Sequence, residues 1–136
     1  MRVVLERGAK MPTRATEGSV GYDLYSREDV WVPAGGVVVI DTGVHAELAP
    51  DEMGEVRGRS GLAKRGVMVA TGTLDPDYRG SIGVILYNVS GIEYHIHEGD
   101  RVAQLVILPV RTPELVQVDS LSETARGDGG FGSTGK

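Results

Sequence analysis

Two carboxylates, a tyrosine and an arginine stand together in one glycine-bounded stretch, residues 72–80. An aspartate such as Asp75 can act as a general base that takes a proton from water, and Tyr78 can form one wall of a pocket. The same residues also suit a charged turn between strands, because Asp-Pro-Asp favours turns and Gly closes them. The stretch alone therefore leaves a catalytic and a structural interpretation open.

Two further segments carry groups that bind phosphate or a metal ion. Arg59, Ser60 and Gly61 place a guanidinium, a hydroxyl and an unhindered amide side by side, which suits charge-assisted hydrogen bonds to phosphate. Asp23 offers a carboxylate flanked by apolar strand residues. A tripeptide is a weak signal, and a lone aspartate is more often part of a strand edge or turn, so neither segment identifies a site by itself.

The C-terminal end is rich in glycine, with five Gly among the ten residues 126–135. Such a composition is typical of a flexible, solvated tail. The tail also contains Arg126, Ser133 and Thr134, and its glycine backbone can surround an anion with N–H groups. Phe131 is the only Phe of the chain. A large apolar ring is unusual in a loose polar tail, so it favours a tail that packs against a flat surface.

Histidine gives a weaker signal. His95 and His97 lie in a segment, residues 92–97, whose apolar side chains alternate, so both share one face of a predicted half-buried strand. Two imidazoles on one face can ligate a metal. Because no third Cys or His lies at ligand spacing, the sequence favours a solvated face over a metal site.

Short strands must position these groups, because β-branched runs recur about every eight to twelve residues with turn clusters between them. Helical periodicity is nearly absent. The best helix candidate is one or two turns that begin at Ser60, which can cap them, and end at Gly66. The pattern predicts an all-β sandwich or barrel. The predicted strands comprise residues 3–5, 30–32, 37–40, 67–69, 82–87, 102–108 and 115–118.

Length and composition set further limits. A chain of 136 residues corresponds to one domain. Its net charge of −5 argues against a general nucleic-acid binder, which needs a dense cationic surface. The chain has no Cys, which excludes thiolate catalysis and a disulfide framework. Because it shows neither a signal peptide nor a run of about 18 apolar residues, we expect a soluble, cytoplasmic protein with no membrane partner.

Five segments, taken in order, resemble the five motifs of the trimeric dUTP pyrophosphatase (dUTPase) family. The match spans residues 20–135, almost the whole chain, and five ordered motifs are far more specific than any one of them. The segments are VGYDL (20–24), GRSGLA (58–63), GTLDPDYRG (72–80), GDRVAQL (99–105) and RGDGGFGSTG (126–135).

The resemblance implies a fold and an activity. The protomer would be an all-β, distorted jelly roll of the β-clip type, with residues 1–125 as the domain. Residues 126–136 would be a flexible arm that closes over the active site of a neighbour in a homotrimer. The enzyme would be a dUTP diphosphatase that hydrolyses dUTP to dUMP and pyrophosphate with Mg²⁺. It would keep uracil out of DNA and supply dUMP for dTMP synthesis.

The resemblance also implies residue roles at the base and sugar. Asp75 would deprotonate the water that attacks the α-phosphorus, and Tyr78 would lie against the deoxyribose and exclude a 2′-hydroxyl. The backbone of Gly72, Thr73 and Leu74 would pair with the edge of uracil. Such pairing leaves groups of the site unsatisfied when the wrong base enters, which discriminates strongly.

The other motifs would hold the triphosphate and the metal. Asp23 would bind magnesium through its water shell, in line with the reluctance of Mg²⁺ to dehydrate, and Phe131 would stack on uracil. The implied phosphate-binding and arm residues are Arg59, Ser60, Gly61, Gln104, Arg126, Gly132, Ser133 and Thr134.

Two other functions fit less well. A dCTP deaminase, a structural relative, is disfavoured because the chain matches the dUTPase motifs throughout, including the uracil-binding hairpin and the Phe-bearing arm. A regulatory protein that recruits a partner through arm closure is disfavoured because the sequence lacks an inserted domain for that role. The presence of Asp75 favours retained hydrolysis.

Overall fold

The computed structural model describes residues 1–130, which form short strands and one short helix. The prediction of an all-β protomer with one short helix is therefore confirmed. In chain order the elements are β1 (Arg2–Leu5), β2 (Gly21–Tyr25), β3 (Val30–Val32), β4 (Val37–Asp41), β5 (Val44–Glu47), β6 (Glu52–Arg57), α1 (Ser60–Ala63), β7 (Val67–Val69), β8 (Gly72–Leu74), β9 (Gly83–Asn88), β10 (Tyr94–Ile96) and β11 (Arg101–Pro109).

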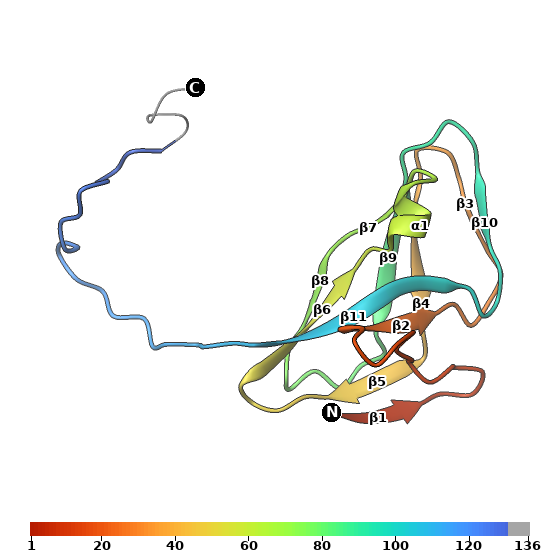
Figure 1. Cartoon of the computed structure of the whole chain (residues 1–136), viewed down its shortest axis with the longest axis horizontal. Coiled ribbons are helices and arrows are strands. Elements are labelled where there is room, and N and C mark those ends of the chain that lie inside the picture. Colours follow the sequence, from red (N-terminus) through yellow and green to blue (C-terminus); the bar gives the residue numbers. More distant parts are fainter. Residues whose placement is uncertain (131–136) are drawn as a thin grey trace.

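Antiparallel pairing joins the strands into small sheets (Figure 1). The largest has the order β2-β11-β6-β8, and a three-stranded sheet has the order β4-β9-β7. β1 pairs with β5, and β3 pairs with β10. Because β11 pairs with both β2 and β6, the largest sheet brings segments that are far apart in the sequence to one surface.

One apolar core receives side chains from every sheet. In β9, Val84 and Leu86 are buried whereas Ile85 is exposed, which is the alternation expected of a strand with one face on the core. Each fully buried aliphatic side chain contributes roughly 1.5–3 kcal/mol relative to exposure. Core side chains that are completely buried include Leu24, Val32, Ile40, Val84, Leu86, Ile96, Val102 and Leu105.

Two details of the predicted elements are wrong. Ser60 does not cap the helix: it is the first helical residue, and Arg59, still extended after β6, occupies the cap position without a side-chain cap. Residues 115–118 form no strand, because no strand of the described chain lies beside them, and β-propensity needs a pairing partner to act. Strands β5 and β6 have no clear β-branched run and escaped prediction, since pairing with β1 and β11 stabilises them.

The chain leaves the body after Val110, whose N–H donates to the backbone oxygen of Asp51. Up to residue 130 it then runs as an extended segment away from the sheets (Figure 1). Leu115 in this segment is 94% exposed, and Leu121 is 86% exposed. In the part of the chain that the structure describes, no helix is long and apolar enough to cross a membrane.

Candidate active site

The turn after β8 presents Asp75 next to a free strand edge. β8 is the last strand of its sheet and pairs within the described chain only with β6, so its outer backbone groups have no strand partner. The backbone N–H of Tyr78 donates to the backbone oxygen of Asp75 at 3.1 Å. This closes a turn with Asp at its first position and Pro76 at its second, a favoured arrangement.

A small hollow of about 210 Å³ lies beside this turn. It is smaller than the roughly 300–1,000 Å³ typical of drug-sized ligands, so it suits a small ring system. Tyr78 donates its hydroxyl to the backbone oxygen of Ser81 at 3.0 Å, which fixes the ring along one wall. The lining residues are Val56, Gly72, Thr73, Leu74, Asp75, Tyr78, Ser81, Ile82 and Gly83.

Gly80 makes room for the Tyr78 ring. A Cβ at Gly80 would lie 2.2 Å from the Tyr78 hydroxyl oxygen and 2.4 Å from the ring carbon that bears it. Real Cβ atoms essentially never come this close, so a side chain at residue 80 would displace the Tyr78 ring from its observed position.

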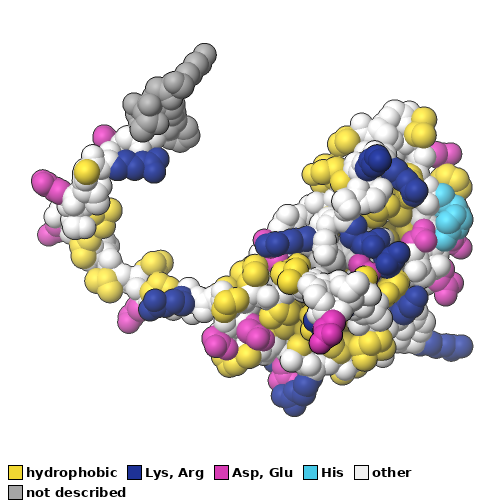
Figure 2. All heavy atoms as spheres, in the orientation of Figure 1, with side chains coloured by type: hydrophobic (Ala, Val, Ile, Leu, Met, Phe, Trp, Pro, Cys, Tyr) yellow, Lys and Arg dark blue, Asp and Glu magenta, His cyan; other side chains and the backbone are white. Residues whose placement is uncertain are grey.

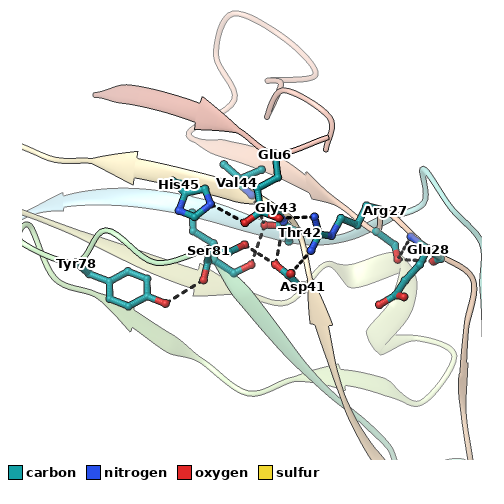
Figure 3. A network of polar contacts seen from close by, with 12 residues as sticks. Glu6, Arg27, Glu28, Asp41, Thr42, Gly43, Val44, His45, Tyr78 and Ser81 are labelled. Carbon is teal, nitrogen blue, oxygen red and sulfur yellow. Dashed lines mark hydrogen bonds and ion pairs between the residues drawn. The ribbon is translucent and has the colours of Figure 1, made fainter. Parts of the chain in front are cut away.

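A network of polar contacts supports the turn from the neighbouring strands (Figure 3). The hydroxyl of Ser81 donates to Asp41, and the guanidinium of Arg27 binds Asp41 as well. Arg27 also binds Glu6 at 2.6 Å, and Glu6 accepts from Nε2 of His45 at 3.0 Å. Ser81 had no role predicted from the sequence, and no spacing pattern links these five residues.

His45 completes the network on the other side of the turn. Its Nδ1 contacts the backbone oxygen of Arg79 at 2.8 Å, so both ring nitrogens face acceptors and both must carry protons to be satisfied. The Arg79 carbonyl, followed by the carboxylate of Glu6, therefore raises the pKa of His45. The pKa of Glu6 is lowered, chiefly by His45, and the pKa of Asp41 is lowered, chiefly by the hydroxyl of Ser81.

A second hollow, of about 480 Å³, lies where α1 meets β2 and β11. Figure 2 shows Lys and Arg side chains gathered over this face of the body. The hollow contains every body residue that the sequence assigned to the triphosphate and the metal. Its lining residues are Ala15, Ser19, Val20, Gly21, Asp23, Arg59, Ser60, Gly61 and Gln104.

Asp23 is the charged centre of this hollow. It is only 8% exposed, and its two carboxylate oxygens accept from Arg59 at 2.9 Å and from Arg101 at 3.4 Å. A buried carboxylate needs such partners, because burial without them is costly. Arg101 belongs to the fourth motif but received no role from the sequence, although a cation at that position was a visible signal.

Gln104 lies opposite Asp23 in the register of β11 and β2. Its amide nitrogen donates to the backbone oxygen of Gly58 at 2.9 Å. A Cβ at Gly21 would lie 2.2 Å from the Gln104 amide oxygen, so glycine is the residue that admits this side chain. The sheet thus aligns an acid and an amide donor along one wall.

The predicted site residues fall into separate groups. Among residues 1–130, the hollow around Asp75 and the hollow around Asp23 share no lining residue. Arg126 lies on the extended segment, where its Nε donates to the oxygen of Gly129 at 2.9 Å, and it meets neither hollow. The predicted arm residues Phe131, Gly132, Ser133 and Thr134 lie outside the described residues.

Comparison with known proteins gives a consistent result. The family model described as dUTPase matches residues 7–135. The deoxyuridine 5′-triphosphate nucleotidohydrolase of Paramecium bursaria Chlorella virus 1 is 46% identical over 132 residues, which cover 96% of this chain and 94% of that protein.

Solved structures agree with the sequence relatives. A point mutant of the Staphylococcus bacteriophage 80alpha dUTPase, solved with dUpNHpp, superposes with a TM-score of 0.93 at 31% identity, covering 99% of this chain and 98% of that one. A mutant dUTPase from phage phi11 of S. aureus, whose structure concerns the coordination of a structural Mg(II) ion, has a TM-score of 0.82 at 30% identity, covering 88% and 96%. With a family match over residues 7–135 and a relative that is 46% identical over nearly the full length of both chains, the chain belongs to the dUTPase family.

Proposed function

We propose that this protein is a dUTP diphosphatase that hydrolyses dUTP to dUMP and pyrophosphate. The observation that carries the proposal is the pair of hollows. One combines a free strand edge with a carboxylate, and the other collects phosphate donors around a buried acid, in a chain of the dUTPase family. Each hollow suits one part of the same substrate.

The edge strand β8 would read the base. Main-chain N–H and C=O groups along Gly72, Thr73 and Leu74 can pair with the uracil edge as an added strand would pair. Cytosine presents a donor where uracil presents an acceptor, so it would leave backbone groups unpaired. Tyr78, held by Ser81, would lie against the deoxyribose and exclude a 2′-hydroxyl.

Asp75 would activate the attacking water. Its carboxylate is exposed at the mouth of the hairpin hollow, within a turn that fixes its backbone. As the water oxygen bonds to the α-phosphorus, its proton passes to Asp75, and the bond from the α-phosphorus to the bridging oxygen breaks. Pyrophosphate leaves with that oxygen. General base catalysis of this kind contributes roughly 10²–10⁴-fold.

The second hollow would hold the triphosphate. Arg59, Ser60, Gly61 and Gln104 supply guanidinium, hydroxyl and amide donors to the phosphate oxygens. The ion pair with Asp23 orients the Arg59 guanidinium before substrate arrives. Donors fixed in this way stabilise the charge that develops on the leaving pyrophosphate.

Magnesium fits this hollow through water. Among residues 1–130, Asp23 is the one carboxylate that lines it. Both oxygens of Asp23 already accept from arginines, so direct ligation would compete with two cations. Mg²⁺ usually keeps several waters and binds one or two carboxylates plus substrate phosphates. Asp23 would accept from a metal-bound water while the triphosphate holds the ion, which would supply charge neutralisation.

A homotrimer would join the two halves of the site. The hollows are separate within one chain, so one chain's base pocket would meet another chain's phosphate pocket. Exposed apolar side chains also support an assembly of several chains, because water-exposed apolar patches mark contact surfaces. These side chains are Val37, Val39 and Ile85 on one sheet and Leu115, Val116 and Leu121 on the extended segment.

The arm would close the site. The segment after β11 already reaches outward from its own body (Figure 1), and Arg126 on this segment donates to Gly129 of the same segment. On a neighbour, Arg126, Gly132, Ser133 and Thr134 would bind the γ-phosphate, and Phe131 would stack on uracil. Closure would also exclude water other than the nucleophile.

A steady-state comparison of dUTP, dCTP, dTTP and UTP, with and without Mg²⁺, tests the proposal. Pyrophosphate release should be fast for dUTP with Mg²⁺ and at least about 10²-fold slower for the other nucleotides, because each leaves site groups unpaired or clashes. Ammonia release from dCTP, or equal rates for all four nucleotides, would overturn it.

A further inference from the structure

A second polar cluster lies away from both hollows, on the two-stranded sheet of β3 and β10. His95 pairs with Trp31 in the register of these strands, and the same register extended by one residue sets His97 opposite Asp29. Side chains at alternate positions point to one face, so all four share the outer face of this sheet. Figure 2 shows histidine side chains beside acidic ones at this edge of the body.

The three polar side chains converge on one point. Nε2 of His95 lies 3.6 Å and Nδ1 of His97 lies 3.4 Å from the same oxygen of Asp29. The three potential ligand atoms all lie within 4.8 Å of one another. Asp29 was not predicted as a third ligand, because it is distant from the two histidines in the sequence and is neither Cys nor His.

These distances fit a transition metal ion. With metal–ligand bonds of about 2.0–2.1 Å in tetrahedral geometry, neighbouring ligand atoms lie about 3.3 Å apart. The two distances to Asp29 are within a few tenths of an ångström of that value. The side chain of His97 is 66% exposed. Its ring can therefore rotate to bring its nitrogen closer to that of His95 without disturbing the core.

Neighbouring groups orient the ligands in advance. The His95 ring stacks on Trp31 with a centroid distance of 4.2 Å and an interplanar angle of 3°. The N–H of Glu98 donates to the ligand oxygen of Asp29 at 3.3 Å. Such contacts to ligating groups fix their orientation and raise metal affinity.

We propose that Asp29, His95 and His97 form a binding site for Zn²⁺ or a similar divalent transition metal ion, with water at the remaining position. Imidazole nitrogen suits zinc, copper and nickel, whereas magnesium takes oxygen ligands. The site is therefore chemically distinct from the Mg²⁺ of the proposed hydrolysis. A bound ion would clamp β3 to β10, a strand pair of three residues each that is marginal in isolation.

The stack on Trp31 provides the test, because Trp31 is the only Trp of the chain. Full-length protein without a histidine tag is titrated with ZnCl₂ in excess Mg²⁺ while tryptophan fluorescence is recorded. We expect a saturable change with one ion per chain, reversed by EDTA, and a rise in Tm. Cu²⁺ should quench at the same stoichiometry, and Mg²⁺ alone should change nothing.

Variants locate the ion. His97→Ala and Asp29→Asn each remove a ligand and leave the Trp31–His95 stack, so each should raise the Kd for Zn²⁺ at least about ten-fold. Glu28→Gln, an exposed acid beside Asp29, should bind Zn²⁺ like the unmodified protein. Circular dichroism confirms that the variants are folded. No saturable change, equal Kd values for all proteins, or the same change with Mg²⁺ would overturn the proposal.

Discussion

At the residue scale, the two aspartates of the turn after β8 have different environments. Asp75 lines the hairpin hollow and its backbone oxygen accepts from the N–H of Tyr78, whereas Asp77 does not line that hollow. Both are exposed carboxylates in one turn. The two residues also line a larger neighbouring hollow together, so the pair offers a comparison in which charge and location are nearly equal and the relation to the hairpin hollow differs.

Asp75→Asn should lower kcat for dUTP by about 10²–10⁴-fold, because an amide cannot take the proton of the attacking water. Binding of the analogue dUpNHpp, measured by calorimetry, should change little. Asp77→Asn is the matched control and should retain kcat within a few-fold. Unchanged turnover in Asp75→Asn would refute the role of this residue as the base.

Gly80→Ala should weaken sugar discrimination. The new Cβ would overlap the Tyr78 hydroxyl and force the ring away from the hollow, and a displacement of about 1 Å in a positioning group can cost about 10²-fold. The ratio of kcat/KM for dUTP to that for UTP should therefore fall at least about ten-fold. Gly91→Ala, where a Cβ meets nothing within 4 Å, is the control. Equal ratios in the two variants would contradict the proposed role of Tyr78.

At the element scale, the network between strands determines how firmly the turn is held. β4 contributes Asp41 and β5 contributes His45, and these residues contact the turn through Ser81 and Arg79. Arg27 and Glu6 come from two other segments and link the strands. The turn that carries Asp75 is thus anchored on both sides of Gly80, by His45 at Arg79 and by Asp41 at Ser81. Figure 3 shows the contact between Ser81 and Asp41.

His45→Gln should change how stability depends on pH. The folded-state pKa of His45 is raised above its ordinary value of 6.5, so its stabilisation is complete below that value and is lost as the pH rises through the raised pKa. The Tm of the unmodified protein should exceed that of the variant most at mildly acidic pH, above the range where Glu6 becomes protonated. The difference should shrink at alkaline pH. Melting curves across the pH range check this, and a constant difference would exclude the proposed charge on His45.

The strand pattern shows what local sequence can and cannot predict about elements. The β-branched runs that became β1, β3, β4, β7, β9 and β11 were predictable because such runs recur at short intervals with turn clusters between them. β10 was predictable because the apolar residues of 92–97 alternate, as in a half-buried strand. Residues 115–118 have the same composition but form no strand. Pairing is a tertiary contact, so a run with strand propensity and no neighbour stays irregular.

At the scale of the whole molecule, the extended segment after Val110 carries exposed leucines and valines that a single chain leaves in water. Removing residues 126–136 should lower kcat for dUTP by about 10²-fold or more, because the site would lose its closing donors and its shield from water. The last core strand ends at Pro109, so the truncated protein should keep its Tm. Light scattering should show the same number of chains per assembly as in the full-length protein. A fully active truncation would contradict the proposed arm.

Mixed assemblies test whether neighbours share sites. Full-length Asp75→Asn chains and truncated chains with intact Asp75 are each expected to be nearly inactive. Co-expressed, they should recover part of the activity, since some sites would receive Asp75 from one chain and the arm from another. Activity no higher than the sum of the two parent proteins would indicate that each chain completes its own site.

The chemistry of this protein could be predicted from local stretches of sequence. Residue type and order are local properties, which made Asp75, Tyr78 and the Arg-Ser-Gly tripeptide recognisable. The glycine-bounded stretches predicted tight turns. Which of these groups contact one another depends on the folded chain. Asp23 with Arg101, Ser81 with Asp41 and Asp29 with His95 and His97 are contacts between distant segments. No periodicity encodes such contacts, because they follow from strand register and core packing across the whole chain.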